Sequence, residues 1–177
     1  MRHIRHIPEE ACRLEYNRHK AVEYAHRWAY MRNPLYMDFS GMGGDCTNFV
    51  SQCVYAGAPV MNGTPTYGWY YYGPENRAPA WSGVKYFHRF LISNQGPGPY
   101  AQEVDIREIQ PGDVIQLATV ERDFHHMVLV VSVGEEPAFH TIRIAAHTDD
   151  ADNRLLSSYP IRMIRFLHIV GVRPQKG

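Results

Sequence analysis

The sequence predicts an α+β domain in which helices come first and one antiparallel sheet follows. Residues 9–93 carry apolar positions at helical spacing, whereas residues 114–172 carry short apolar runs separated by turn residues. Hydrophobic residues make up 45% of the chain and charged residues 20%, as in ordinary globular proteins. Because the length of 177 residues is typical of one domain, we expect residues 1–177 to form a single domain.

The first helix is expected over residues 9–31, directly after Pro8, which suits a helix start. Its apolar face repeats at i, i+3, i+4 and i+7 and consists of Ala21, Tyr24, Ala25 and Trp28. Asn33 and Pro34 follow as a helix end. This pattern indicates an amphipathic helix with one face on the core.

A second helix is expected over residues 46–56, after the flexible segment 40–44. Asp45 is a residue type that caps helix starts, and Gly57 is one that ends helices. The buried stripe of this helix consists of Phe49, Val50, Cys53 and Val54. The helix therefore begins at a cysteine.

Residues 58–79 are rich in glycine, proline and aromatic residues, so we expect a long ordered loop. Ser82 can cap a third helix that runs to Ser93. Residues 96–99 read Gly-Pro-Gly-Pro, which closes the helical half of the chain.

The second half predicts strands that pair antiparallel, because connections such as residues 134–137 are short. Pro111-Gly-Asp113 forms the turn that leads into the first of them. The expected strands are residues 114–117, 126–133, 141–147 and 161–172.

The charge balance argues against a nucleic-acid partner, because 18 basic residues face 18 acidic ones. No run approaches the roughly 18 apolar residues of a membrane span. Residues 1–8 also lack the apolar stretch of a secretory leader. We expect a soluble, cytoplasmic protein as given, or an extracytoplasmic one if a leader has been removed. The oligomeric state is left open.

Three cysteines occur without a CxxC pair, which predicts neither a disulfide framework nor a thiolate zinc site. Cys46 and Cys53 would stand about 10 Å apart along one helix, too far to bridge. At least one thiol is therefore free. Since no His-Glu-x-x-His spacing appears, we expect no metal and no other cofactor.

Cys46 is the strongest candidate for a catalytic residue. Gly43 and Gly44 deliver it to the first turn of a helix, where unpaired N–H groups and the helix dipole favour a thiolate. Its own N–H could face a developing oxyanion. The alternative is a buried structural cysteine. The glycine-rich approach favours a nucleophile of low pKa at Cys46, with Cys53 in the core.

A thiol nucleophile needs a base, and His125 and His126 precede the apolar strand that starts at residue 126. Strand alternation allows only one of them to face the nucleophile helix, and His126 is preferred. A third group should orient this imidazole from the next strand. His147 is the choice, while Asp149 and Asp150 could orient the ring instead or cap the turn.

The aromatic loop could form a wall that binds a sugar or peptide, or it could fill space over the core. The expected substrate-binding residues are Asp45, Trp69, Tyr70, Trp81 and Asp149.

Several of these motifs together resemble the putative amidase domain family. They occur in order as Tyr16-Asn-Arg18, Asn33-Pro34, Gly44-Asp-Cys-Thr-Asn-Phe-Val-Ser-Gln52, Trp69-Tyr70, Trp81-Ser82, Gly112-Asp-Val-Ile115, His125-His126 and His147-Thr148. That family is similar in turn to the papain-like, NlpC-type peptidases of the bacterial cell wall. The resemblance implies a papain-like fold with the nucleophile helix packed on the sheet. It also implies a catalytic triad of Cys46, His126 and His147.

The sequence thus predicts a cysteine hydrolase that cleaves an amide bond through an acyl-enzyme. The resemblance implies peptidoglycan stem peptides or a related peptide as substrate. The alternatives are acyl transfer to an amine on the same fold and a cell-wall or glycan-binding module without turnover.

Overall fold

A computed structural model describes residues 13–177, and residues 1–12 lie outside the described part. The helices are α1 (Arg18–Trp28), α2 (Cys46–Gly57), α3 (Pro79–Ser82) and α4 (Val84–Ser93). The strands are β1 (Tyr71–Gly73), β2 (Asn76–Arg77), β3 (Gly98–Val104), β4 (Val114–Ala118), β5 (His126–Ser132), β6 (Arg143–Ala146), β7 (Ala151–Leu155) and β8 (Met163–Arg173). Two short 3-10 helices, η2 (Ile106–Glu108) and η3 (Leu156–Ser158), lie between strands.

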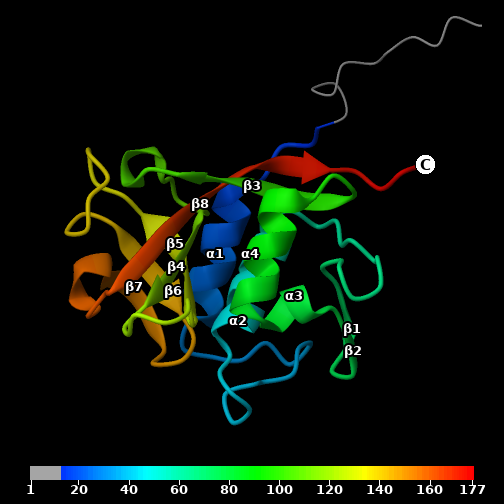
Figure 1. Cartoon of the computed structure of the whole chain (residues 1–177), viewed down its shortest axis with the longest axis horizontal. Helices are drawn as coiled ribbons and strands as arrows, with labels where there is room; N and C mark the ends of the chain where they lie inside the picture. The colour runs from blue at the N-terminus through cyan, green and yellow to red at the C-terminus, as the bar shows by residue number, and fades with distance from the viewer. Residues whose placement is uncertain (1–12) are drawn as a thin grey trace, which may run out of the picture.

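The main sheet has the strand order β3-β8-β4-β5-β6-β7, and every neighbouring pair is antiparallel. Figure 1 shows the long strand β8 crossing the molecule from the side of β4, β5 and β6 toward the helices. Helices therefore precede an antiparallel sheet, and the predicted α+β class is confirmed. No helix in residues 13–177 is long and apolar enough to cross a membrane.

The sheet buries side chains on both faces. On β5, Met127 and Leu129 join Phe49 of α2 in the core between helices and sheet. Val128 and Val130, with the opposite alternation, join a second core on the other face. This alternation follows from the two-residue repeat of a strand, and it fixes which side chains of β5 face α2.

Helix α1 begins at Arg18. Residues 13–17 are therefore not helical, and the prediction of a helix that already includes them is wrong. Residues 9–12 of the predicted helix lie outside the described part of the chain. The chain before α1 is extended because Leu14 pairs with Val172 of β8. The side chain of Asn17 then accepts a hydrogen bond from the N–H of Lys20 at 3.0 Å and caps the helix.

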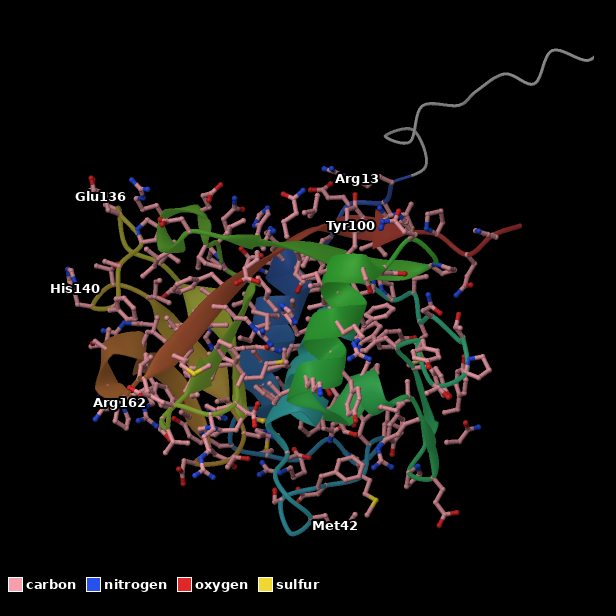
Figure 2. All side chains as sticks on the ribbon, in the orientation of Figure 1. Arg13, Met42, Tyr100, Glu136, His140 and Arg162 are labelled. Atoms are coloured by element: carbon pink, nitrogen blue, oxygen red, sulfur yellow. The ribbon has the colours of Figure 1, made fainter. Side chains whose placement is uncertain are left out.

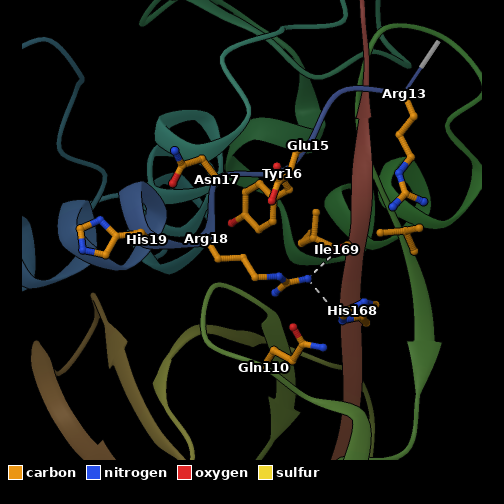
Figure 3. Close-up of a pocket in the computed structure, with 10 residues that line it drawn as sticks. Arg13, Glu15, Tyr16, Asn17, Arg18, His19, Gln110, His168 and Ile169 are labelled. Carbon is orange, nitrogen blue, oxygen red and sulfur yellow. Dashed lines mark hydrogen bonds between the residues drawn. The ribbon is translucent and has the colours of Figure 1, made fainter. Parts of the chain in front are cut away.

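A buried cluster fastens the start of α1 to the sheet. Arg18 contacts the carboxylate of Asp113 at 2.7 Å, and His168 contacts the same carboxylate at 2.8 Å. Figure 3 shows Arg18 reaching toward Ile169 and His168 on β8. Asp113 is fully buried and also accepts the N–H of Ile169. This cluster holds the start of α1 against β4 and β8.

Helix α2 has nearly the predicted bounds, with Asp45 at the N-cap position. However, the Asp45 carboxylate makes no capping bond to its own helix. The last long helix, α4, begins after Gly83 instead of Ser82. The Ser82 hydroxyl instead accepts a hydrogen bond from Arg77 Nε at 3.1 Å.

In the main sheet, the sequence analysis missed β3 and β7, which form its edges. It also missed the short strands β1 and β2, which pair with each other within the loop expected at residues 58–79. Strand β3 contains Pro99 within the expected loop, and only an edge strand accommodates a residue without an N–H. Strand β7 contains Asn153 at a φ of 54°, which interrupts the regular strand pattern. Both strands depend on pairing with distant segments.

Candidate active site

A glycine-rich loop carries the chain from α1 to Cys46. Figure 2 shows Met42 at the tip of this loop, pointing away from the body of the molecule. Gly43 and Gly44 follow with φ values of 98° and 114°, which side chains rarely allow. A Cβ at Gly44 would also meet the Thr148 hydroxyl at 3.3 Å. Glycine is therefore required where the loop turns into the nucleophile helix.

Cys46 is the first residue of α2, and only 8% of its surface is exposed. Its sulfur lies 3.8 Å from the Thr47 hydroxyl and 4.0 Å from the carbonyl oxygen of His125. The N–H of Met127 faces the sulfur from the other side of His126 and lowers the pKa of the thiol. Both peptide groups that flank His126 therefore approach Cys46.

His126, which lies between the two backbone groups that approach the sulfur, is buried, whereas the neighbouring His125 is exposed. The physical reason differs from the predicted one. On β5, Met127 has the alternation that faces α2, so the side chain of His126 projects on the other side of the strand. Within residues 13–177, the sulfur contacts the backbone on either side of His126 and the Thr47 hydroxyl.

The pKa of His126 is lowered to about 4, first by burial and then by the nearby positive charges of His125 and Arg154, while Asp149 partly offsets these effects. The ring is therefore neutral at pH 7 and can accept a proton. In residues 13–177, no hydrogen bond ties this ring to another side chain. Both ring nitrogens remain free for substrate or proton transfer.

Burial also raises the pKa of the Cys46 thiol, and the N–H of Met127 and the Thr47 hydroxyl lower it by smaller amounts. The predicted low pKa is thus wrong for the resting protein, because the desolvation of a nearly buried sulfur outweighs these hydrogen bonds. The geometry describes a neutral thiol beside a neutral imidazole.

His147 does not orient His126 in this structure. Its Nδ1 donates to the Asp45 carboxylate at 2.6 Å, and its Nε2 lies 2.9 Å from the carbonyl oxygen of Trp28. The ring also stacks on Phe49 of α2, with centroids 4.0 Å apart. His147 therefore connects the turn after β6 to the first residues of the nucleophile helix.

Asp45 is enclosed by partners. One carboxylate oxygen accepts the N–H of Phe39 and the amide of Asn48, both at 2.8 Å, and the other accepts His147. Only 1% of the residue is exposed. Asp45 was expected to bind substrate, and in the structure its oxygens are occupied by these partners and shielded from solvent.

Arg32 completes this arrangement and was missed by the sequence analysis. Its guanidinium contacts both oxygens of Asp150 at 2.8 and 3.0 Å and the Ser40 hydroxyl at 3.2 Å. It also lies 3.2 Å from Nε2 of His147. The loop after α1 is thus clamped to the turn between β6 and β7.

The aromatic loop divides into core and surface. Trp69 and Trp81 are fully buried, and their indole N–H groups donate to Ser51 and Asn48 of α2, both at 3.0 Å. The structure places both tryptophans in the core beside α2, which agrees with the alternative that the aromatic loop fills space over the core. Tyr70 is half-buried and stacks on a neighbouring tyrosine at the surface.

Asp149 lies at the exposed tip of the turn between β6 and β7. Thr148 and Asp149 have positive φ values of 64° and 54°, which are uncommon for residues with side chains and concentrate strain next to the site. The Thr148 hydroxyl accepts the N–H of Asp45 at 3.3 Å. This turn is therefore fitted against the residue that precedes the nucleophile.

Tyr159 and Arg154 also border the site without a preceding sequence signal. The rings of Tyr159 and His126 have centroids 5.7 Å apart. The Arg154 guanidinium lies 3.6 Å above the Tyr159 ring. Among residues 13–177, no group of three or more His, Cys, Asp or Glu side chains is placed to hold a metal ion.

Residues 15–170 match the family described as "Putative amidase domain". The chain belongs to this family. The match includes Cys46, His126, His147 and the segments that connect them. Membership of the putative amidase domain family supports an amidase, a hydrolase that acts on amide bonds.

A related protein of Bacillus subtilis (strain 168), uncharacterized protein YhbB, is 36% identical over 123 residues. The alignment covers 67% of this chain but 38% of the length of that relative. No solved structure matches the chain. The details of the chemistry in this member of the putative amidase domain family therefore have to be argued from its own residues.

Proposed function

We propose that the protein is a cysteine amidase with Cys46 as nucleophile and His126 as general base. The Cys46 sulfur attacks the amide carbonyl while His126 takes the thiol proton, so that an S–C bond and a tetrahedral oxyanion form. The C–N bond then breaks, and His126 returns the proton to the leaving amine. Water, activated by the same ring, hydrolyses the thioester and restores the thiol.

One observation carries this assignment. The carbonyl of residue 125 and the N–H of residue 127 both face the Cys46 sulfur, so the residue between them, His126, starts beside the nucleophile. The neutral imidazole, with a pKa lowered to about 4, is in the protonation state that a base needs at pH 7. A surface histidine would have neither this position nor this burial.

His147 has a positioning role in this proposal. By binding Asp45 at 2.6 Å and stacking on Phe49, it holds the start of α2 against the sheet. The members of the expected triad thus divide their tasks. Cys46 and His126 react, and His147 fixes the helix that presents the sulfur.

The proposed substrate is a peptide amide, with peptidoglycan stem peptides as the first class to test. The support is the resemblance to papain-like peptidases of the bacterial cell wall, in which a helix-borne cysteine meets a sheet-borne histidine. In this protein α2 begins with Cys46 and β5 begins with His126. Residues 1–177 are proposed to act as one papain-like domain.

The test is the release of new amino groups from a panel of peptidoglycan stem peptides. Cys46→Ala should abolish release while leaving the unfolding midpoint nearly unchanged, because the sulfur makes only long contacts of 3.8 and 4.0 Å. Cys53→Ala is the matched control, because this cysteine lies in the core. It should retain turnover despite some loss of stability from the cavity.

Wild-type protein that binds these peptides without amine release above the Cys46→Ala level would contradict the hydrolase. If the peptides become joined to an added amine instead, the chemistry is acyl transfer. Binding with neither reaction would favour the non-catalytic cell-wall module.

A further inference from the structure

The hydroxyl of Tyr159 is buried and has no hydrogen-bond partner within residues 13–177. Leaving such a group unpaired is costly, so native proteins satisfy nearly all of them. Exceptions call for an explanation, and a ligand that is absent from the resting protein supplies one. The position of Tyr159 beside the candidate catalytic pair makes a reacting substrate the relevant ligand.

Local contacts hold the Tyr159 ring in place without using its hydroxyl. The Arg154 guanidinium carbon lies 3.6 Å from the ring centroid, a cation–π arrangement. Arg154 Nε meanwhile donates to the Ser158 hydroxyl at 2.8 Å. Although the nearby Arg154 lowers the pKa of the phenol, its guanidinium lies over the ring face and makes no well-aligned bond to the hydroxyl.

The ring also lies next to the reacting groups. Its centroid is 5.7 Å from that of His126, at an interplanar angle of 48°. Burial raises the pKa of Tyr159, and the negative charge of Asp149 raises it further. The hydroxyl therefore keeps its proton at neutral pH and is available as a donor when negative charge develops near the sulfur.

An attacked amide carbonyl needs such donors. The helix start at Cys46 offers backbone N–H groups that have no carbonyl partner inside α2. Oxyanion sites commonly pair a backbone donor with a side-chain donor that is already in place before reaction. His126 takes the proton of the thiol, and the Thr47 hydroxyl lies 3.8 Å from the sulfur itself. The phenol of Tyr159, whose hydroxyl has no partner in the described residues, is the donor that is unused in the resting protein.

We propose that the Tyr159 hydroxyl donates a hydrogen bond to the oxyanion that forms when Cys46 attacks the substrate carbonyl. The C=O electron pair moves onto oxygen as the S–C bond forms, and the phenol proton stays on Tyr159 throughout. This inference rests on the proposed function, because it assigns a second catalytic residue to the same site. It also accounts for the unpaired hydroxyl in the resting protein.

Tyr159→Phe removes only this hydroxyl and keeps the ring packed on His126. We expect kcat to fall about 10²–10³-fold, the usual effect of losing one oxyanion donor. KM should change little, and the unfolding midpoint should stay the same or rise, because the lost group had no partner.

Tyr16→Phe is the matched control. Tyr16 is also buried, but its hydroxyl donates to the carbonyl of Gly112 at 2.9 Å, far from Cys46 in the fold. This variant should lose stability and keep kcat. A purely structural role for Tyr159 predicts a different outcome, in which Tyr159→Phe keeps kcat as well.

Acylation by 4-nitrophenyl acetate separates this inference from the proposed amidase. A nitrophenol burst in wild type that is absent in Cys46→Ala establishes the nucleophile without an amide substrate, and Tyr159→Phe should slow it about 10–10²-fold. A burst and an amide turnover unchanged in Tyr159→Phe would overturn the oxyanion role and leave the amidase standing. A normal burst in wild type without hydrolysis of any peptide amide would overturn the proposed amidase activity. In that case, a slower burst in Tyr159→Phe would still support Tyr159 as the oxyanion donor.

Discussion

Two clusters meet at the start of α2 and differ in how their polar groups are satisfied. The closed cluster consists of Asp45, His147 and Arg32, and most of its hydrogen bonds go to one another and to neighbouring loops. The exception is Arg32 Nε, which makes no hydrogen bond but lies 3.3 Å from the Asp38 carboxylate and 3.8 Å from that of Asp45. The open cluster consists of Cys46, His126 and Tyr159. Its groups lie close together, but the His126 ring and the Tyr159 hydroxyl lack partners in the described residues.

The difference separates structural from chemical roles. Side chains whose hydrogen bonds are complete rigidify a structure, and side chains left incomplete at a site are available to a substrate. Asp45 and His147 resemble the pair of Asp113 and His168 at the other end of the sheet, which also holds a helix start. A buried carboxylate–imidazole pair is therefore a fastening device used twice in this fold.

The largest effect is expected on kcat, from substitutions in the open cluster. His126→Gln should lower kcat about 10³-fold, within the usual range for loss of a general base, and should leave stability at pH 7 nearly unchanged. His125→Gln is the matched control, because its ring is exposed and should contribute little. Steady-state rates of both variants test the comparison. A larger loss in His125→Gln would reverse the assignment.

Substitutions in the closed cluster should lower the free energy of unfolding. His147→Ala leaves the Asp45 carboxylate buried without its imidazole, and we expect the free energy of unfolding to fall by about 3 kcal/mol. His168→Ala should cost less, because Asp113 keeps its 2.7 Å contact with Arg18. Urea denaturation at pH 7 measures both changes. Equal losses of unfolding free energy in the two variants would contradict this, because they would show that the remaining contact between Asp113 and Arg18 does not stabilise the protein.

Acid should destabilise the protein through His126. Its pKa is about 4 when folded, against about 6.5 when unfolded, so the unfolded chain binds more protons between these values. Stability is complete above pH 6.5 and falls as the pH drops toward 4, by about 2 kcal/mol at pH 5 for this residue. His126→Gln should remove this contribution to the dependence of the unfolding free energy on pH. Identical pH profiles for the two proteins would be incompatible with a buried neutral ring.

The smallest effect is expected at the rim of the closed cluster. Arg32→Lys loses the two-point contact with Asp150, which is partly exposed, so about 1 kcal/mol of stability should be lost. The catalytic rate should stay within about threefold of wild type, because Arg32 contacts neither Cys46 nor His126 by a hydrogen bond in the described structure. Thermal unfolding and kcat of this variant are the measurements. A loss of kcat without a loss of stability would place Arg32 in the open cluster.

Local signals account for what could be predicted. The Gly43-Gly44 approach and the apolar stripe lie within one short segment, so α2 and its cysteine were predicted almost to the residue. The sheet strands with continuous apolar runs were also predicted. The start of α1 and the edge strand β3 were not, because both depend on pairing with β8, more than 60 residues away in sequence.

The same distinction holds at the site. The choice of His126 over His125 agrees with their burial, because His126 is buried and His125 is exposed. The aromatic composition of the loop suggested a binding wall that includes Trp69. The hydrogen bond from Trp69 to Ser51 exists only in the folded chain, and composition does not reveal it. Tyr159 carries no local motif, and only the folded chain brings it to His126.

The most direct test of the account is to label the thiols and measure turnover in the same sample. In a Cys12→Ser background, which removes the cysteine outside the described residues, the folded protein is treated with iodoacetamide and analysed by peptide mass mapping. We predict that Cys46 is modified while the fully buried Cys53 is not, and that amine release falls in proportion to Cys46 modification. Full modification of Cys46 with undiminished turnover, or modification of Cys53 in its place, would contradict the account.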